Sequence, residues 1–343
     1  MEKVTVYIET QVPHASQIIT GFLRLKEQGW PVELVDCRDS GSPYCGMPMM
    51  RAEYRGMKLI YDVGDGYNVP DDMEIGLKDC DVYFKRSFSA VKNQQLLPAY
   101  VDKMYPLGFN YHLTHKNNPI NEPLWKHFLK PLLGRTPDRY FVPEVFEGTA
   151  ERIEGTPKIL FLTRLWEREE DLPPEVNEER DLINEMRICI VKSLRQRYGD
   201  AFLGGVNDTP LSREIAPELI MPSAYTERKK YLKLLHSCDI CIGSMGLFES
   251  IGWKTGEYVA AAKAIVNERF HYTVTGDYRE GIHYLPFETA EECLAAVEEL
   301  ARDPEKLYAM KKANEEYYQR YLKPEILVKN SLDLVDCILA EKT

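Results

Sequence analysis

Short apolar segments alternate with stretches of helical periodicity along this chain of 343 residues. From Ser16 to Glu27, apolar residues recur every three or four positions, as on one face of an amphipathic helix. Short strands flank and follow this helix in the first half, and we predict them at Lys3–Ile8, Val32–Val35, Lys58–Tyr61, Val82–Phe84 and Met104–Pro106. Strands that alternate with helices are typical of a mostly parallel sheet, so the pattern predicts an α/β fold.

The second half repeats this alternation. Its predicted strands are Lys158–Leu162, Ala201–Gly204, Ile240–Ile242, Ala264–Val266 and Ile282–Leu285. Its predicted helices are Asn177–Tyr198, Glu227–His236, Gly256–Lys263, one from Thr289 to Arg302 with Glu292 completing a capping box, Pro304–Tyr321 and Glu325–Glu341. A helical segment, Glu122–Leu133, precedes a charged, glycine-bearing link at Glu147–Pro157, which indicates a hinge. The two halves therefore predict two domains, residues 1–150 and 151–324.

The segment from Cys238 to Val266 has the order strand, loop, helix, strand. In such units ligands bind beyond the carboxyl end of the strand, here at the loop that starts at Gly243. Glu249 and Glu257 follow with seven residues between them, which would be about 12 Å along the axis if both were helical. That is about the span of a nucleotide diphosphate sugar from sugar to ribose. A helix N-terminus near Gly252 would offer free N–H groups to a diphosphate.

This segment resembles the retaining GT-B glycosyltransferases of the group 1, or family 4-like, type, which carry a Glu-x7-Glu motif. The resemblance includes the strand before the motif and the Lys–Ala–Ile–Val segment after it, and it extends over residues 158–324. It is weaker over the first half. It implies two Rossmann-like domains that face each other across a cleft, with the last helix, residues 325–343, crossing back to the first domain.

The resemblance also implies roles for residues of the second domain. Glu249 would lie near the transferred sugar, and Glu257 would accept hydrogen bonds from the ribose hydroxyls. Arg164, after the first strand of this domain, would bind the diphosphate, although an ion pair with Glu167 or Glu169 is the alternative. The family's usual second cation is absent at its normal spacing, and the residues that could contribute to donor binding are Arg168, Lys254, Gly246, Leu247, Ser250 and Ile251.

The first domain would bind the acceptor. Loops after its strands carry polar residues, of which we take His14 as the candidate catalytic residue and Asp65, Arg86 and His112 as further cleft candidates. An acceptor hydroxyl must lose a proton during transfer. In a retaining enzyme the departing phosphate can take that proton, so a protein base is not required.

Composition narrows the class of protein. A hydrophobic content of 44% and an aromatic content of 11% exclude global disorder. The net charge of −11, from 43 basic and 54 acidic residues, argues against a partner that is a nucleic acid or an anionic membrane. Eight scattered cysteines and the lack of a signal peptide or a long apolar run favour the cytoplasm, with at most peripheral membrane contact.

Other cofactor motifs have the wrong context. Asp79-Cys-Asp81 precedes its strand, whereas a metal-binding Asp-x-Asp would follow one, and His112-Leu-Thr-His115 has no third ligand nearby. The segment after the first strand lacks the glycines of a dinucleotide-binding loop. The spacing of Cys238 and Cys241 suits a metal, but both lie on a strand predicted to be buried, where they would serve packing. We therefore expect no metal and no cofactor beyond the donor substrate.

These observations predict a metal-independent, retaining glycosyltransferase. Its donor would be a UDP- or GDP-sugar, and its acceptor a hydroxyl of a glycan, a lipid-linked compound or a small molecule. By analogy with the family, the product would be a bacterial polysaccharide, a glycolipid or a glycosylated metabolite. Two alternatives stay open: a nucleotide-sugar epimerase of GT-B-like fold, and a non-catalytic protein that binds a nucleotide sugar in support of another transferase.

Overall fold

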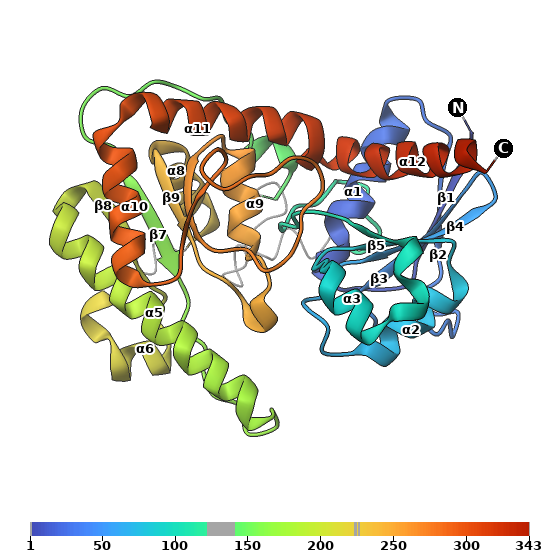
Figure 1. The fold of residues 1–343 in the computed structure, drawn as a ribbon, viewed down its shortest axis with the longest axis horizontal. Helices are drawn as coiled ribbons and strands as arrows, with labels where there is room; N and C mark the ends of the chain where they lie inside the picture. Colours follow the sequence, from blue (N-terminus) through green and yellow to red (C-terminus); the bar gives the residue numbers. More distant parts are fainter. Residues whose placement is uncertain (1, 122–140, 223–224, 226, 343) are drawn as a thin grey trace. The chain divides into compact units, whose positions relative to one another are not determined.

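The computed structural model describes residues 2–121, 141–222, 225 and 227–342, so the predicted helix Glu122–Leu133 lies outside the described residues. The chain forms two compact units, which we call unit 1 and unit 2 (Figure 1). Unit 1 contains residues 1–145, 271–277 and 319–343, and unit 2 contains residues 146–270 and 278–318. Unit 2 thus begins at Phe146, a few residues before the predicted boundary, and it includes the link that we predicted as a hinge.

Unit 1 is built on a sheet of six strands in the order β2-β1-β3-β4-β5-β6. The strands are β1 Val4–Ile8, β2 Val32–Asp36, β3 Met49–Tyr54, β4 Met57–Asp62, β5 Val82–Lys85 and β6 Met104–Pro106. All neighbours are parallel except β3, which pairs antiparallel with both β1 and β4. β3 was not predicted. It joins β4 through Arg55 and Gly56, whose φ angles of 51° and 78° suit a two-residue hairpin turn.

The helices of unit 1 are α1 Ser16–Glu27, α2 Pro70–Asp79, α3 Ala90–Leu96 and α12 Pro324–Glu341. α12 packs on α1 in one apolar core, where Val328 and Leu332 join Ile18 and Phe22. The approach is close at Gly21, because a Cβ atom there would lie 2.3 Å from the carbonyl oxygen of Pro324. The predicted return of the last helix to the first half of the chain is therefore confirmed.

Unit 2 has a fully parallel sheet in the order β11-β10-β9-β7-β8. Its strands are β7 Ile159–Thr163, β8 Phe202–Val206, β9 Ile240–Gly243, β10 Ala264–Glu268 and β11 Leu285–Phe287. Numbered along the chain, this order is 2-1-3-4-5 read from β8. This is a doubly wound arrangement: the chain adds β8 on one side of β7 and then β9 on the other, so the strand order reverses between β7 and β9. Every residue of β7 and β9 is buried, as expected for strands covered on both faces.

The helices of unit 2 are α5 Pro174–Tyr198, α6 Pro210–Ile215, α8 Arg228–Ser237, α9 Trp253–Ala260, α10 Ala290–Arg302 and α11 Pro304–Tyr317. α5 packs against α10, whereas α9 packs against β9, β10 and α11. In Figure 1 the N-terminal end of α5 projects away from the sheet. No helix of the described residues combines the length and hydropathy that a membrane span requires.

Three local predictions in unit 2 were wrong. α9 begins at Trp253 rather than Gly256, because Gly252 is its N-cap in an extended conformation. β11 begins only at Leu285, because the chain turns at Gly281, where φ is 76°. At the start of α10, the Glu292 carboxylate accepts a hydrogen bond from the backbone N–H of Glu288 and not from the cap residue, so the capping box is displaced by one residue. The α/β class itself is confirmed in both units, whereas a cleft between two facing domains stays a prediction.

Candidate functional site

The carboxyl ends of β7 and β9 mark the place in unit 2 where a ligand is expected. In a doubly wound sheet, ligands bind outside the carboxyl ends of the two strands between which the strand order reverses. β7 and β9 are parallel neighbours, so the loops that follow them, residues 164–169 and 244–250, lie at the same edge of the sheet. We call this place the switch-point edge. The site residues predicted for the second half lie on these two loops and on the segment that begins α9.

Arg164 directly follows β7 and carries an exposed cation of the first loop. Its guanidinium carbon lies 5.5 Å from the centre of the Trp166 ring, and no acidic side chain in the described part of the chain pairs with it. The alternative of an ion pair with Glu167 or Glu169 is therefore not observed. Instead, Arg180 of α5 pairs with Glu169 at 2.9 Å. The charge of Arg164 is available to an anionic ligand.

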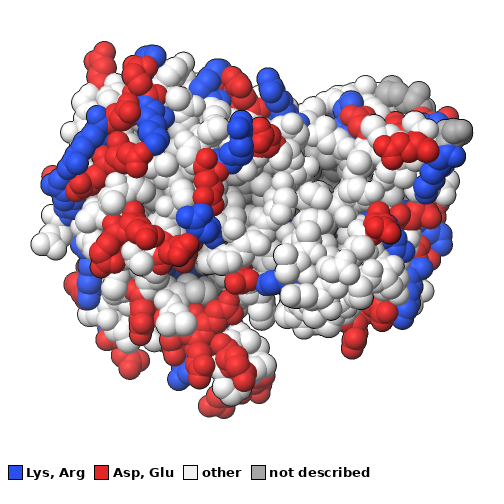
Figure 2. All heavy atoms as spheres, viewed as in Figure 1, with Lys and Arg blue, Asp and Glu red and all other residues white. Residues whose placement is uncertain are grey.

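Arg168 lies in a different electrostatic environment. Its guanidinium is 3.4 Å from the Asp181 carboxylate of α5, and both side chains are exposed. The surrounding segment, residues 167–185, contains nine acidic and two basic residues. Figure 2 shows acidic side chains gathered around the N-terminal end of α5. The charge of Arg168 is thus matched by a carboxylate, whereas that of Arg164 is not.

Lys254 reaches the switch-point edge from the first turn of α9. Its ammonium group donates a hydrogen bond to the backbone carbonyl of Leu162, next to the carboxyl end of β7, and lies 5.8 Å from the centre of the Tyr231 ring. Burial lowers the pKa of Lys254 to about 8, although the nearby Glu257 carboxylate acts in the opposite direction. The N-terminal end of α9, where the helix dipole is positive, also lies here. A cation and a helix N-terminus therefore lie together beside the end of β7.

Glu257 is buried and already has partners within the protein. Both terminal nitrogens of Arg228 lie 3.0 Å from one carboxylate oxygen, and the Tyr231 hydroxyl donates to the other. Arg228 and Tyr231 belong to α8, and neither was predicted to contribute to the site. A carboxylate offers about four acceptor positions, so these three hydrogen bonds leave about one position for a ribose hydroxyl. The ribose role of Glu257 stays a prediction. A ribose would share the carboxylate with Arg228 and Tyr231.

Glu249 does not continue the helix of Glu257. It ends the short 3-10 segment Leu247–Glu249, where Phe248 and Glu249 have φ angles of 58° and 60°. The separation of about 12 Å along one helix axis, which holds only if both glutamates are helical, therefore does not apply. The left-handed conformation of two non-glycine residues is uncommon and typical of a loop held by its surroundings. Here the backbone N–H of Phe248 donates to Glu179 at 2.7 Å.

The remaining predicted loop residues form a closed turn. The N–H of Gly246 donates to the carbonyl of Ser250 at 2.8 Å, and the N–H of Ser250 donates back to the carbonyl of Leu247 at 3.1 Å. A Cβ atom on Gly246 would lie 2.7 Å from the Ser250 hydroxyl oxygen, so a larger residue there would displace that hydroxyl. Ser250 and Ile251 are buried, and Leu247 is half-buried. Their binding roles stay predictions.

A row of buried polar side chains on α5 was missed by the sequence analysis. Asn177, Arg180, Asn184 and Arg187 are spaced by three, four and three residues, so they share one face of the helix. All four donate hydrogen bonds to the loop after β7. The spacing of these polar residues was visible in the sequence, but it resembled the solvated face of an amphipathic helix.

In unit 1 the structure brings three of the four acceptor-side candidates together. A terminal nitrogen of Arg86 lies 3.3 Å from Nδ1 of His14, and the same nitrogen pairs with Asp65. Burial and the Arg86 charge lower the pKa of His14. His112 instead has its ring centre 4.6 Å from that of Phe141. The catalytic role of His14 stays a prediction.

The metal-like motifs have other contacts. His115 lies 3.1 Å from Glu27, Asp79 pairs with Lys58 at 2.8 Å, and Asp81 accepts the backbone N–H of Lys58. Cys238 and Cys241 are buried free thiols. Among residues 2–121, 141–222 and 227–342, no three His, Cys, Asp or Glu side chains cluster as metal ligands would.

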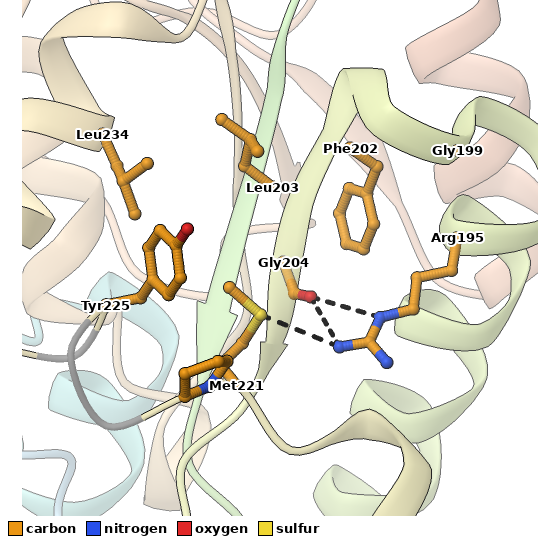
Figure 3. Close-up of a pocket in the computed structure, with 9 residues that line it drawn as sticks. Arg195, Gly199, Phe202, Leu203, Gly204, Met221, Tyr225 and Leu234 are labelled. Atoms are coloured by element: carbon orange, nitrogen blue, oxygen red, sulfur yellow. Dashed lines mark hydrogen bonds between the residues drawn. The ribbon is translucent and has the colours of Figure 1, made fainter.

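A pocket of about 410 Å³ in unit 2 lies beside the edge strand β8 and includes no residue of the two switch-point loops (Figure 3). It is lined by the amino-terminal part of β8 together with Met221, Tyr225 and Leu234. Arg195 supplies its cation, but that guanidinium donates to the backbone carbonyls of Gly204, Glu218 and Leu219. The other lining side chains are apolar or aromatic, so the pocket has less to offer a diphosphate than the switch-point edge has.

Comparison with known proteins gives structural likenesses alone. No protein-family model and no curated protein matches the sequence. HepE of Anabaena in complex with UDP has a TM-score of 0.42 and 11% identity over 97% of this chain and 100% of its own. MnaA of S. aureus with UDP has a TM-score of 0.43 and 14% identity over 95% and 98% of the two chains. Sucrose-phosphate synthase of Thermosynechococcus elongatus has a TM-score of 0.43 and 9% identity over 99% and 100%.

Proposed function

We propose that this chain is a glycosyltransferase that uses a nucleotide diphosphate sugar as donor. The observation that carries the proposal is the charge arrangement at the switch-point edge. Arg164 directly follows the last residue of β7, and Lys254, in the first turn of α9, donates to the carbonyl of Leu162 in the same strand. Neither cation has a carboxylate partner within 4 Å in the described residues. A diphosphate is a leaving group whose charge such cations and N–H groups would neutralise.

The rest of the donor would follow the second loop and α9. Glu257, shared with Arg228 and Tyr231, would accept hydrogen bonds from the ribose. Glu249, on the strained segment, would lie near the sugar that is transferred. We propose UDP or GDP as the nucleotide and transfer with retention, in which the departing phosphate oxygen receives the proton of the acceptor hydroxyl as the bond between sugar and phosphate breaks.

The acceptor would bind to unit 1, where His14, Arg86 and Asp65 lie together. We propose a hydroxyl of a glycan, a lipid-linked compound or a small molecule, and a role in polysaccharide, glycolipid or metabolite synthesis. All eight cysteines are free thiols, which supports a reducing cytoplasm as the compartment.

Two experiments test the proposal in sequence. Thermal unfolding is measured with UDP, GDP and their common sugars, because a ligand that binds the folded protein raises its melting temperature. The nucleotide sugar that stabilises the protein is then incubated with candidate acceptors in EDTA, and the products are separated. Transfer to an acceptor that persists in EDTA is the expected result. Epimerised sugar would favour the epimerase, and binding without turnover would favour the non-catalytic partner.

A further inference from the structure

The loop after β7 is attached to α5 along most of its length. The amide of Asn184 makes two hydrogen bonds of 2.8 Å, to the backbone N–H and the carbonyl of Trp166. The amide of Asn177 makes the same pair of bonds to Glu169, at 3.0 and 2.9 Å. Arg180 donates to the carbonyl of Glu167 at 2.6 Å. A loop whose backbone is paired in this way has little freedom to move, although it carries an exposed cation.

Arg187 is the member of this row that contacts both loops of the switch-point edge. One terminal nitrogen donates to the carbonyl of Arg164 at 2.5 Å, and the other donates to the carbonyl of Met245 at 3.0 Å. Its Nε donates to the Ser244 hydroxyl at 3.0 Å. Three donors of one planar guanidinium thus hold the first residue of one loop and the first two of the other. An ammonium group, with all donors on one nitrogen, cannot span these positions.

Arg187 makes these contacts in a buried environment. The residue is 6% exposed, and burial lowers its pKa to about 10. The Glu268 carboxylate acts in the opposite direction on the pKa of Arg187, and it accepts the N–H of Met245 at 2.6 Å. A buried cation that hydrogen-bonds backbone carbonyls is costly to keep. A buried guanidinium is consistent with a site that requires the backbone at Arg164 and Met245 to be held in one arrangement.

We propose that Arg187 is a positioning residue that couples the two loops of the switch-point edge, so that α5 presets the Arg164 side of a diphosphate site before any ligand arrives. The identity of the ligand rests on the proposed function, whereas the coupling of the loops does not. The Arg187 guanidinium donates to protein groups and holds the loop that carries Arg164, whereas Arg164 and Lys254 would contact the phosphates. Its effect on a nucleotide should therefore be confined to the diphosphate part.

The same helix provides a matched control in Arg195. This residue also donates to backbone carbonyls, those of Gly204, Glu218 and Leu219, and to the Met221 sulfur at 3.8 Å. Gly204 and Met221 line the pocket of Figure 3, and none of these groups belongs to the two loops of the switch-point edge. Arg187→Lys and Arg195→Lys thus make the same chemical change on one helix. Only the first variant acts on the switch-point edge.

Hydrogen exchange in the unliganded protein tests the coupling directly. We expect Arg187→Lys to accelerate amide exchange in both 164–169 and 244–250, and Arg195→Lys to accelerate it only near 204 and 218–221. Asn184→Ala, which detaches Trp166 alone, should accelerate exchange in 164–169 and leave 244–250 unchanged. It keeps the test decisive if Arg187→Lys does not fold. Acceleration of 244–250 by Asn184→Ala, or of one loop alone by Arg187→Lys, would overturn the coupling.

Calorimetry with UDP and UMP, and with GDP and GMP, tests the consequence for the ligand. Arg187→Lys should weaken binding of the diphosphate by about tenfold or more while the monophosphate changes by less than about threefold. Arg195→Lys should change neither by more than about threefold. Equal losses for diphosphate and monophosphate would contradict a positioning role. If the wild-type protein binds none of the four nucleotides, the proposed function fails, and the exchange measurement still decides whether Arg187 couples the loops.

Discussion

The carboxyl edges of the two sheets occupy equivalent positions in their units but differ in electrostatics. At the edge of unit 1, cations are matched by carboxylates: Lys85 pairs with Asp62 at 2.8 Å, Arg51 pairs with Glu9 at 2.7 Å, and Arg86 pairs with Asp65. At the switch-point edge of unit 2, Arg164 and Lys254 have no such partner among the described residues. The topology alone would allow a ligand at either edge.

This difference indicates which edge can receive an anion. A cation that already pairs with a carboxylate would lose that interaction in order to bind phosphate, whereas Arg164 would gain one. Arg187 donates its hydrogen bonds to backbone carbonyls, and neither the exposed Arg164 nor the partly buried Lys254 has a carboxylate partner among the described residues. Unit 1 instead offers a neutralised polar edge, which suits a hydroxyl-bearing acceptor better than a second diphosphate. The following predictions test this contrast, and they are ordered by expected effect.

Removal of the Lys85 charge should have the largest effect, on stability. Lys85 and Asp62 are both fully buried, so Lys85→Met would leave the Asp62 carboxylate without a compensating charge. We expect the free energy of unfolding to fall by about 3–5 kcal/mol in urea denaturation. The control is Lys58→Met, which breaks an exposed pair with Asp79 and should cost less than about 1 kcal/mol. Equal losses in the two variants would mean that the unit 1 edge is not held by buried charge.

Removal of the Arg164 charge should act on ligand affinity and not on stability. We expect Arg164→Ala to weaken the binding of a nucleoside diphosphate by about 1.5–3 kcal/mol, which is roughly tenfold or more, because a charge-assisted hydrogen bond is lost. Arg168→Ala is the control, since its guanidinium pairs with Asp181. Isothermal calorimetry measures both. If Arg168→Ala has the larger effect, our choice of cation is wrong.

Glu257 should affect nucleotide binding through its contact with the ribose and protein stability through its ion pair with Arg228, and two variants can separate these effects. Glu257→Gln removes a carboxylate that would bind ribose and also breaks the pair with Arg228. We expect about tenfold weaker nucleotide binding, together with a loss of stability that the sequence analysis did not anticipate. Arg228→Gln breaks the same pair and retains the carboxylate. Equally weakened binding in both variants, measured by calorimetry, would assign Glu257 to the ion pair and not to the ribose.

The smallest effect should be a pH dependence from Lys254, whose pKa is about 8. The protonated form would bind diphosphate, so affinity should be constant below pH 8 and fall by at most about tenfold per pH unit above it. Lys254→Arg should remove this dependence because arginine stays protonated. At pH 8 calorimetry in two buffers should detect uptake of about half a proton. Since an unfolded lysine has a pKa near 10.4, the contribution of Lys254 to stability should rise with pH between about 8 and 10.4.

Local sequence pattern was sufficient for most of the secondary structure. The periodicity of α1 and the short apolar runs of β6 and β9 placed these elements closely, because burial imposes a repeat that neighbouring residues share. Strand β3 was missed because its sequence, MMRAEY, mixes charged and apolar residues. β3 lies between β1 and β4 because its backbone pairs antiparallel with both of these strands.

The candidate site could be located from the sequence, but its charge pattern could not. The strand–loop–helix order around Glu249 and Glu257 indicated a ligand at this sheet edge, since chain order is a local property. The partners of Arg168 and Glu257 lie 13 and 29 residues away, and only packing brings them into contact. Asn184 and Arg187 look like solvated residues in the sequence. They are buried because the loop after β7 covers them, and that coverage is a property of the tertiary structure.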